Sequence, residues 1–250
     1  MKIIAIFFCL MLSVNSEVHA EWMRISDSTI RLSGDIQKGD FERYLELAKE
    51  GYSKLELRSF GGVPLIALKI ADDVVKRRVE VVIDGYCFSA CANYLALSGK
   101  TLTVPCDSLV GWHGSPTNKS NDEVAKESFS EGHPKELTSI LVNWISDFRE
   151  RELRFYKVIG VNISLLHDSV VIPGKLKRSQ PIVNFKFDQE TGDISISKTV
   201  TAVSWIPGPN ILEKYGVVTS GYCHGYTQED VRTLLVKYGM AGMYFSLDEL

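Results

Sequence analysis

The sequence predicts an α/β fold in which strand-helix units repeat around a mainly parallel sheet. Short β-branched or alternating segments take turns with segments of helical period in the first half of the chain. The resulting order is strand, helix, strand, helix, strand, helix, strand, which favours a parallel sheet covered by helices. A chain of 250 residues, 45% hydrophobic and 24% charged, can bury a full core, most simply in one domain.

Alternation of apolar and polar residues, together with residues that start and stop helices, predicts the first three elements. "STIRLSGDI" (28–36) alternates apolar and polar residues and predicts a strand. "FERYLELAKEG" predicts a helix that Asp40 can cap and Gly51 can end. "SKLELRSFGG" (53–62) alternates again, so we expect a second strand that runs into a double glycine.

The same pattern continues to residue 114. "VPLIALKIADDVVKRR" predicts a helix from Pro64, and the β-branched "VEVVIDG" (79–85) a buried strand. "GYCFSACANYLALSG" (85–99) is interpreted as a third helix. "TLTVP" (101–105) and "SLVGWHG" (108–114) then give two more strands. The predicted core therefore covers about 28–115.

Beyond the core the pattern changes. The polar "SPTNKSNDEVAKESFSEGHPKE" has little apolar periodicity and predicts a mobile loop. The next segment predicts a long amphipathic helix, in which "RERELR" is densely charged. "IVNFKFDQETGDISIS" predicts a hairpin that turns near Thr191-Gly192, and "WIPGPNILEKYGVV" a short helix and a strand. The expected ranges are 115–136 for the loop, 134–159 for the long helix, 181–198 for the inserted hairpin and 227–240 for a C-terminal helix.

The N-terminal segment "MKIIAIFFCLMLSVNSEVHA" predicts a secretory signal peptide. One lysine precedes an apolar run from Ile3 to Val14, and Val18-His19-Ala20 fits a cleavage site after Ala20. The run is too short for a good transmembrane span. We therefore expect a signal peptide at 1–20 and a soluble, single-domain mature protein at 21–250 that is periplasmic or secreted. A net charge of −3 gives no reason to expect a nucleic acid partner.

Four cysteines remain after cleavage, an even number in a compartment that permits disulfides. Cys87 with Cys91 is the local pairing and Cys91 with Cys106 a longer one, and the sequence does not choose between them. A zinc site from Cys223, His224 and a distant cysteine lacks the usual C-x-x-C spacing. We therefore expect disulfides and no metal.

Three loops are predicted at the carboxyl ends of strands, where sites gather in parallel sheets. Gly61 and Gly62 lack a Cβ and let backbone amides approach a substrate. Ser89 lies where a strand gives way to a helix, beside the free amides of the first turn, including that of Ala90. His113 ends a later strand. A hydroxyl, an imidazole and free amides are the groups that acyl transfer needs.

"RSFGG", "GYCFSACANYLALSG" and "VPCDSLVGWHGS" together resemble the ClpP/crotonase superfamily, in particular the proteolytic subunit of the Clp protease. The resemblance covers about 30–114, and extends less closely to the long helix and to "ILEKYGVV". It implies that Ser89 is the nucleophile and His113 the base. It also implies an oxyanion hole in the Gly61-Gly62 loop and at Ala90. The flanking cysteines are more similar to a secreted branch of the family.

The chain departs from the family pattern at two places. Phe60 stands where the family has proline in the glycine loop. The third triad member, an aspartate in the family, has two candidate positions: counting forward from the long helix gives Asp168, and counting back from Tyr215-Gly216 gives Ser204. Both stay open at the level of sequence.

These observations predict an exported serine hydrolase, a peptidase with a peptide or polypeptide substrate and no cofactor. The alternative is a non-catalytic exported binding or assembly protein on the same scaffold. The family's rings, which form through the long helix, imply a homo-oligomer. An ATP-driven unfoldase partner is not expected, because ATP is scarce outside the cytoplasm.

Overall fold

The computed structural model describes most of the chain after the N-terminal segment. The predicted signal peptide up to residue 19, the hairpin turn near Thr191-Gly192 and His224 lie outside the described residues. The described ranges are 20–174, 182–187, 194–199, 203–223 and 225–247.

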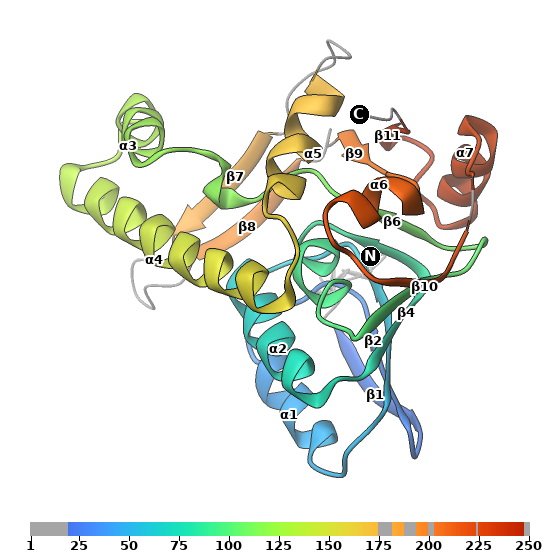
Figure 1. Cartoon of the computed structure of the whole chain (residues 1–250). Coiled ribbons are helices and arrows are strands. Elements are labelled where there is room, and N and C mark those ends of the chain that lie inside the picture. Colours follow the sequence, from blue (N-terminus) through green and yellow to red (C-terminus); the bar gives the residue numbers. More distant parts are fainter. Residues whose placement is uncertain (1–19, 175–181, 188–193, 200–202, 224, 248–250) are drawn as a thin grey trace, which may run out of the picture.

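A mixed sheet of seven strands forms the centre of the molecule (Figure 1). Its order is β1-β2-β3-β4-β5-β10, and β6 also pairs with β4. All of its pairings are parallel except that of β1 with β2. The α/β prediction with a mostly parallel sheet is therefore confirmed. The strands are β1 Glu21–Ser26, β2 Thr29–Ser33, β3 Lys54–Ser59, β4 Glu80–Phe88, β5 Thr101–Val104, β6 Leu109–Gly111 and β10 Thr219–Tyr222.

The helices pack on this sheet and bury its central strands. Leu55, Leu57, Val81 and Ile83 of the central strands have no exposed surface. Figure 1 shows α1 and α2 side by side, with the long α4 extending away from them, while the C-terminal elements gather beside β6. The helices are α1 Asp40–Ala48, α2 Pro64–Arg77, α3 Asn121–Ser130, α4 Lys135–Ile159, α5 Ser164–Gly174, α6 Pro209–Lys214 and α7 Gln228–Lys237.

Several predicted elements are confirmed, with small changes of boundary. The long helix and the C-terminal helix are α4 and α7. The hairpin is the antiparallel pair β7 Ile182–Phe187 and β8 Ile194–Thr199. The short helix expected in "WIPGPNILEKYGVV" is α6, and the strand expected there lies just after this segment, as β10.

Two predictions about α1 and the segment before α4 were wrong. The segment predicted as a mobile loop contains a short 3-10 helix, Pro116–Asn118, and then α3. A reciprocal capping box between Ser120 and Glu123 starts α3, and this local signal outweighs the weak apolar periodicity. Asp40 is also not a helix cap. It is the first residue of α1, and its buried carboxylate accepts from the amide of Gln37.

Sequence reasoning missed three strands. β1 is an edge strand with only partly buried side chains, so it lacks clear alternation. β9 Val203–Trp205 and β11 Tyr244–Ser246 have three residues each and pair with each other in parallel. Such short strands leave almost no periodic signal.

Two disulfides are present. The local pairing Cys87–Cys91 is confirmed, with an S–S distance of 2.04 Å. The longer alternative Cys91–Cys106 is wrong, because Cys106 pairs with Cys223 across 117 residues. The zinc alternative also fails, since the Cys223 sulfur is in this bridge. Two disulfides are compatible with an oxidising compartment outside the cytoplasm.

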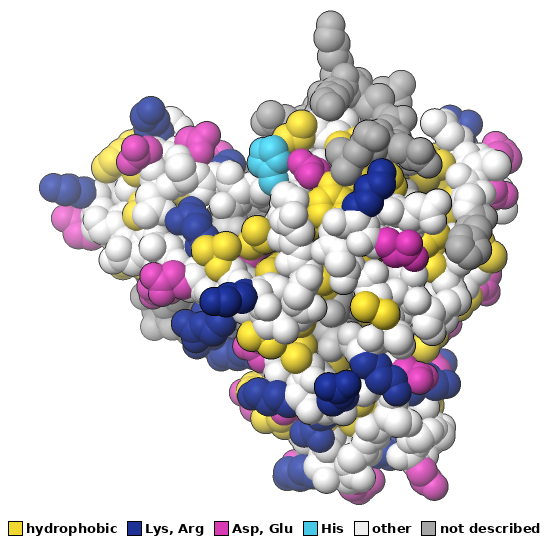
Figure 2. All heavy atoms as spheres, in the orientation of Figure 1, with side chains coloured by type: hydrophobic (Ala, Val, Ile, Leu, Met, Phe, Trp, Pro, Cys, Tyr) yellow, Lys and Arg dark blue, Asp and Glu magenta, His cyan; other side chains and the backbone are white. Residues whose placement is uncertain are grey.

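The surface carries charges of both signs. In the face drawn in Figure 2, basic and acidic side chains are interspersed, with hydrophobic side chains scattered among them. Within the described ranges no single helix is long and apolar enough to cross a membrane. Taken together, α4 and Ser164–Ile172 have sufficient length and apolar composition, but the two helices meet at an angle of 108°.

Candidate active site

A bulge in β4 directs the chain toward Ser89. The first part of β4 pairs with β5 and its last part with β6. On the other side, Leu57 of β3 pairs with Ile83, and Ser59 pairs with Cys87. Two steps along β3 therefore match four steps along β4. Such bulges bend a strand and often adjoin active sites.

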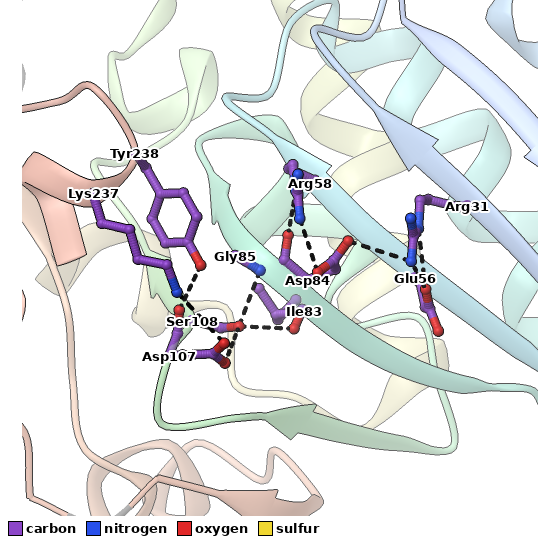
Figure 3. Close-up of polar contacts among 10 residues, drawn as sticks. All are labelled: Arg31, Glu56, Arg58, Ile83, Asp84, Gly85, Asp107, Ser108, Lys237 and Tyr238. Atoms are coloured by element: carbon purple, nitrogen blue, oxygen red, sulfur yellow. Dashed lines mark hydrogen bonds and ion pairs between the residues drawn. The ribbon is translucent and has the colours of Figure 1, made fainter.

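Polar side chains from neighbouring elements hold this bulge (Figure 3). The Ser108 hydroxyl accepts from the Gly85 amide and donates to the Ile83 carbonyl, both at 3.0 Å. The Arg58 guanidinium donates to the Asp84 carbonyl at 2.8 Å and pairs with its carboxylate at 3.0 Å. The backbone groups that the bulge removes from the ladder thus have new partners.

Ser89 directly follows β4 in a left-handed backbone conformation, with φ of 57°. Within the described chain only one other non-glycine residue, Arg78, has a positive φ. This conformation costs about 1–3 kcal/mol and clusters at functional sites. A strained strand-to-helix turn also projects a nucleophilic side chain outward. The Ser89 hydroxyl is partly exposed and has no hydrogen-bond partner among the described residues.

The local disulfide encloses the Ser89 turn. Cys87 lies next to the last residue of β4 and Cys91 begins a π-helix, Cys91–Leu95, and both cysteines are fully buried. The segment predicted as a third helix is thus strand up to Phe88 and only a short π-helix afterwards. π-Helical turns are rare and frequently occur at functional sites. The disulfide fixes both ends of the turn that carries Ser89.

The structure brings the glycine loop against Ser89. A Cβ on Gly61 would lie 2.8 Å from the Ser89 Cβ and from the amide nitrogen of Ala90, so only glycine fits there. The Gly61 amide itself donates to the Ser59 hydroxyl at 3.0 Å. Gly61 therefore contributes close packing, while its own N–H is occupied.

The Gly62 amide faces no acceptor in the described part of the chain. It bridges Ile36 in parallel, with hydrogen bonds between Ile36 and the backbones of Gly61 and Val63. These bonds leave the Gly62 amide without an acceptor among the residues that the structure describes. The amide of Ala90, which opens the helical turn, is likewise unpaired within the described part of the chain. Two such donors beside a serine could bind an oxyanion.

His113 reaches the same edge of the sheet. Phe88 of β4 pairs in parallel with Gly111 of β6, and the Ser89 amide lies 3.3 Å from the Gly111 carbonyl to which it donates. Ser89 and His113 therefore follow the ends of two adjacent parallel strands. The His113 side chain is partly buried. It makes no hydrogen bond with the Ser89 hydroxyl, and catalytic hydrogen bonds are often long in ligand-free sites.

The Asp168 carboxylate is engaged elsewhere. One of its oxygens accepts from the Tyr215 hydroxyl at 2.7 Å, and the other lies 3.1 Å from Nδ1 of His167. Burial and the adjacent carboxylate raise the pKa of Tyr215 above its ordinary value. These contacts join α5 to the end of α6 and do not involve His113.

Ser204 lies opposite His113 in the backbone register. Trp112 and Trp205 form an antiparallel bridge with two hydrogen bonds, of 2.9 and 2.7 Å. In an antiparallel pair, the residue after Trp112 faces the residue before Trp205. The Ser204 hydroxyl is buried and has no partner in the described ranges. Of the two candidates for the third triad position, the register therefore places Ser204 beside His113.

Sequence reasoning missed the residues that hold the turn after His113. Asn93, one helical turn beyond Ser89, is buried, and its Nδ2 donates to the Gly114 carbonyl at 2.8 Å. Glu152 of α4 contacts the same turn through Ser115. Asn93 stands inside the quoted cysteine motif, but nothing in its spacing shows which carbonyl it reaches.

Phe60 begins an aromatic cluster beside the glycine loop. Its ring lies 4.5 Å from that of Tyr86 and 6.3 Å from that of Phe88. Tyr238 of α7 extends the cluster, with its ring 5.6 Å from that of Tyr86. The aromatic side chain of Phe60 therefore gives the glycine loop an apolar flank.

Comparison with known proteins gives no family for this chain. No family model matches the sequence, and no curated protein is significantly similar to it. Among the described residues, no group of three or more His, Cys, Asp or Glu side chains could hold a metal ion.

Proposed function

We propose that this protein is an exported serine hydrolase that cleaves peptides, on a scaffold of the ClpP/crotonase type. The observation that carries the proposal is the left-handed backbone of Ser89 at the end of β4, with Gly61 packed against it. A structural serine at a strand-to-helix turn needs neither the strain nor a glycine loop in contact with it. Both are what a projected nucleophile beside an oxyanion hole requires.

The proposed reaction follows the acyl-enzyme route. The Ser89 oxygen attacks the substrate carbonyl while His113 takes the hydroxyl proton, and the new oxyanion binds the amides of Gly62 and Ala90. The intermediate collapses, the amine leaves with the proton from His113, and an acyl ester remains on Ser89. Water, deprotonated by His113, then hydrolyses this ester and regenerates the serine.

Ser204 is our candidate for orienting the His113 ring. Its hydroxyl can accept a hydrogen bond from one ring nitrogen and so set the tautomer, as the third residue of a triad does. A neutral hydroxyl stabilises the imidazolium less than a carboxylate. We therefore expect slower turnover than in an enzyme with an aspartate at this position.

Export is supported by two separate observations. The chain begins with the signal-like segment described above, and its two disulfides suit an oxidising compartment. We propose that the mature protein acts in the periplasm or outside the cell.

The second candidate function is a non-catalytic binding or assembly protein on the same scaffold. It is favoured by the serine that stands opposite His113, where a working triad has a carboxylate. In this case Ser89 and the glycine loop are an inherited groove that binds a peptide without cleaving it.

A fluorophosphonate probe separates the two functions. We expect the mature protein to gain one phosphonyl adduct, located on Ser89 by mass spectrometry, and Ser89→Ala to gain none. Ser53→Ala, at an exposed serine, is the matched control and should label like the wild type. Absence of labelling in wild-type protein that melts cooperatively would favour the binding protein.

A further inference from the structure

The carboxylate of Glu152 is fully buried in the middle of α4. Its Oε1 accepts from the Tyr94 hydroxyl at 2.6 Å and from the Ser115 hydroxyl at 2.6 Å. Its Oε2 accepts from the Thr117 hydroxyl. Three hydroxyl donors therefore converge on one carboxyl group, and when that group is ionised each becomes a charge-assisted hydrogen bond of the stronger kind.

These donors come from both sides of the candidate active site. Tyr94 lies in the π-helix that follows Ser89, whereas Ser115 and Thr117 follow His113 directly. Glu152 thus joins the segment after the proposed nucleophile to the segment after the proposed base. In the described part of the chain, the two segments are also linked by the Asn93 side chain, whose amide donates to the Gly114 carbonyl.

A second residue of α4 repeats the arrangement one turn later. The Tyr156 hydroxyl donates to the Asn93 carbonyl at 3.0 Å. Glu152 and Tyr156 therefore fix the π-helix from the same face of α4. Through these hydrogen bonds, α4 fixes the distance between the π-helix and the turn after His113. Hydrogen bonds define this distance more specifically than apolar packing would.

We propose that Glu152 is a positioning residue that holds the turn after His113 in register with Ser89. Its effect on catalysis rests on the proposed function, but its effect on the placement of His113 does not. Glu152 touches neither the substrate nor the reacting atoms. It acts through Ser115 and Thr117 on the backbone that carries the imidazole.

The ionised form of Glu152 suits this role, because a carboxylate only accepts hydrogen bonds. Protonation would turn one oxygen into a donor and would oppose a hydroxyl that already points at it. The ionisable groups around Glu152 are Tyr94 from the π-helix, and Tyr156 and Arg149 from α4 itself. Both tyrosines stay neutral, because burial raises the pKa of each well above its ordinary value.

The test compares Glu152→Gln with Thr138→Val. Thr138 lies on the same helix and makes a buried hydrogen bond of 2.8 Å with Ser128, away from the His113 turn. We expect Glu152→Gln to slow fluorophosphonate labelling by about 10- to 100-fold, since a displacement near 1 Å can cost that much. Hydrolysis of a peptide ester should lose kcat by a similar factor, with KM changed much less. Thr138→Val should label like the wild type.

The imidazole signals of His113, assigned by their loss in His113→Gln, supply a readout that does not need activity. We expect them to shift in Glu152→Gln and to stay in place in Thr138→Val. Unchanged His113 signals in folded Glu152→Gln would overturn the proposal, whether or not the wild type is an enzyme. If wild-type protein does not react with the probe, the hydrolase fails, and the NMR comparison still decides the role of Glu152.

A milder pair of variants covers the case in which Glu152→Gln does not fold. Ser115→Ala with Thr117→Val removes the loop donors and leaves the carboxylate bonded to Tyr94. The same shift of His113 signals is expected from this pair. Signals identical to those of the wild type would overturn the proposal.

Discussion

The backbone of Gly61 packs against the side chain of Ser89 so closely that a Cβ on Gly61 would come within 2.8 Å of the Ser89 Cβ. Real Cβ atoms do not approach other atoms this closely without displacing them. The glycine loop and the serine turn are therefore one packed unit, and a side chain on Gly61 must displace Ser89.

Gly61→Ala tests this contact. Gly61 has a φ of 101°, so alanine adds backbone strain as well as the steric clash. We expect the free energy of unfolding to fall by about 3 kcal/mol, measured by urea denaturation, and labelling of Ser89 to be lost. Gly39→Ala is the matched control: its φ is 89°, and nothing lies within 4 Å of the added Cβ. Equal destabilisation of the two variants would show that the contact with Ser89 contributes nothing.

The long disulfide should matter more for the stability of the fold, and the short disulfide more for the reactivity of Ser89. In the chain-entropy model, loss of the short Cys87–Cys91 loop costs about 2 kcal/mol, and loss of the long Cys106–Cys223 loop about 5 kcal/mol. Only the short loop encloses Ser89. We therefore expect Cys87→Ala with Cys91→Ala to lower the labelling rate more, and Cys106→Ala with Cys223→Ala to lower the melting temperature more. Equal loss of labelling in both double variants would argue against a role of the short bridge in holding Ser89.

The sequence was sufficient to predict the order of strands and helices in the core, because each buried face leaves a periodic pattern within its own segment. It was also sufficient to place Gly61, Ser89 and His113 at strand ends. The pairing of Cys106 with Cys223 could not be predicted, since it depends on which distant strands become neighbours.

Glu152 shows most clearly what local sequence patterns do not predict. It stands within "RERELR", a densely charged segment of the predicted helix in which nothing local singles out one residue as buried. Its burial is decided by three hydroxyl groups that lie 58, 37 and 35 residues away in sequence. A buried charge of this kind leaves no local pattern. The choice between Asp168 and Ser204 was ambiguous for a related reason. Which of them lies opposite His113 depends on the bridge between Trp112 and Trp205, which sequence reasoning did not anticipate.

Ser204→Ala and Asp168→Asn discriminate between the two candidates for the third position. Ser204 faces His113 in register, whereas the Asp168 carboxylate is bonded to Tyr215. We expect Ser204→Ala to slow probe labelling by about tenfold, well below the 10⁴-fold effect of a lost triad carboxylate. Asp168→Asn keeps an acceptor for Tyr215 and should label at the wild-type rate. The reverse result, with slow labelling only in Asp168→Asn, would assign the orienting role to Asp168.

The pH dependence of stability gives a separate measure of Glu152. Burial raises the pKa of this carboxyl above its ordinary value of 4.5, although the hydrogen bonds from Ser115, Thr117 and Tyr94 oppose the shift. The folded state then holds the proton more tightly than the unfolded state. The stability contributed by Glu152 is therefore greatest at low pH and falls as pH rises from 4.5 through the folded-state pKa.

Urea denaturation of the wild type and of Glu152→Gln across this range should show the effect. The advantage of the wild type over the variant should shrink as pH rises above about 4 and level off once the folded carboxyl is ionised, because glutamine has no proton to lose. An advantage that grows with pH would mean that the three hydroxyl donors outweigh burial. A decline that levels off would show that Glu152 ionises in the folded state at a cost in stability. The His113 signals of Glu152→Gln, compared with those of the wild type on that plateau, then report how the ionised carboxylate positions the proposed base.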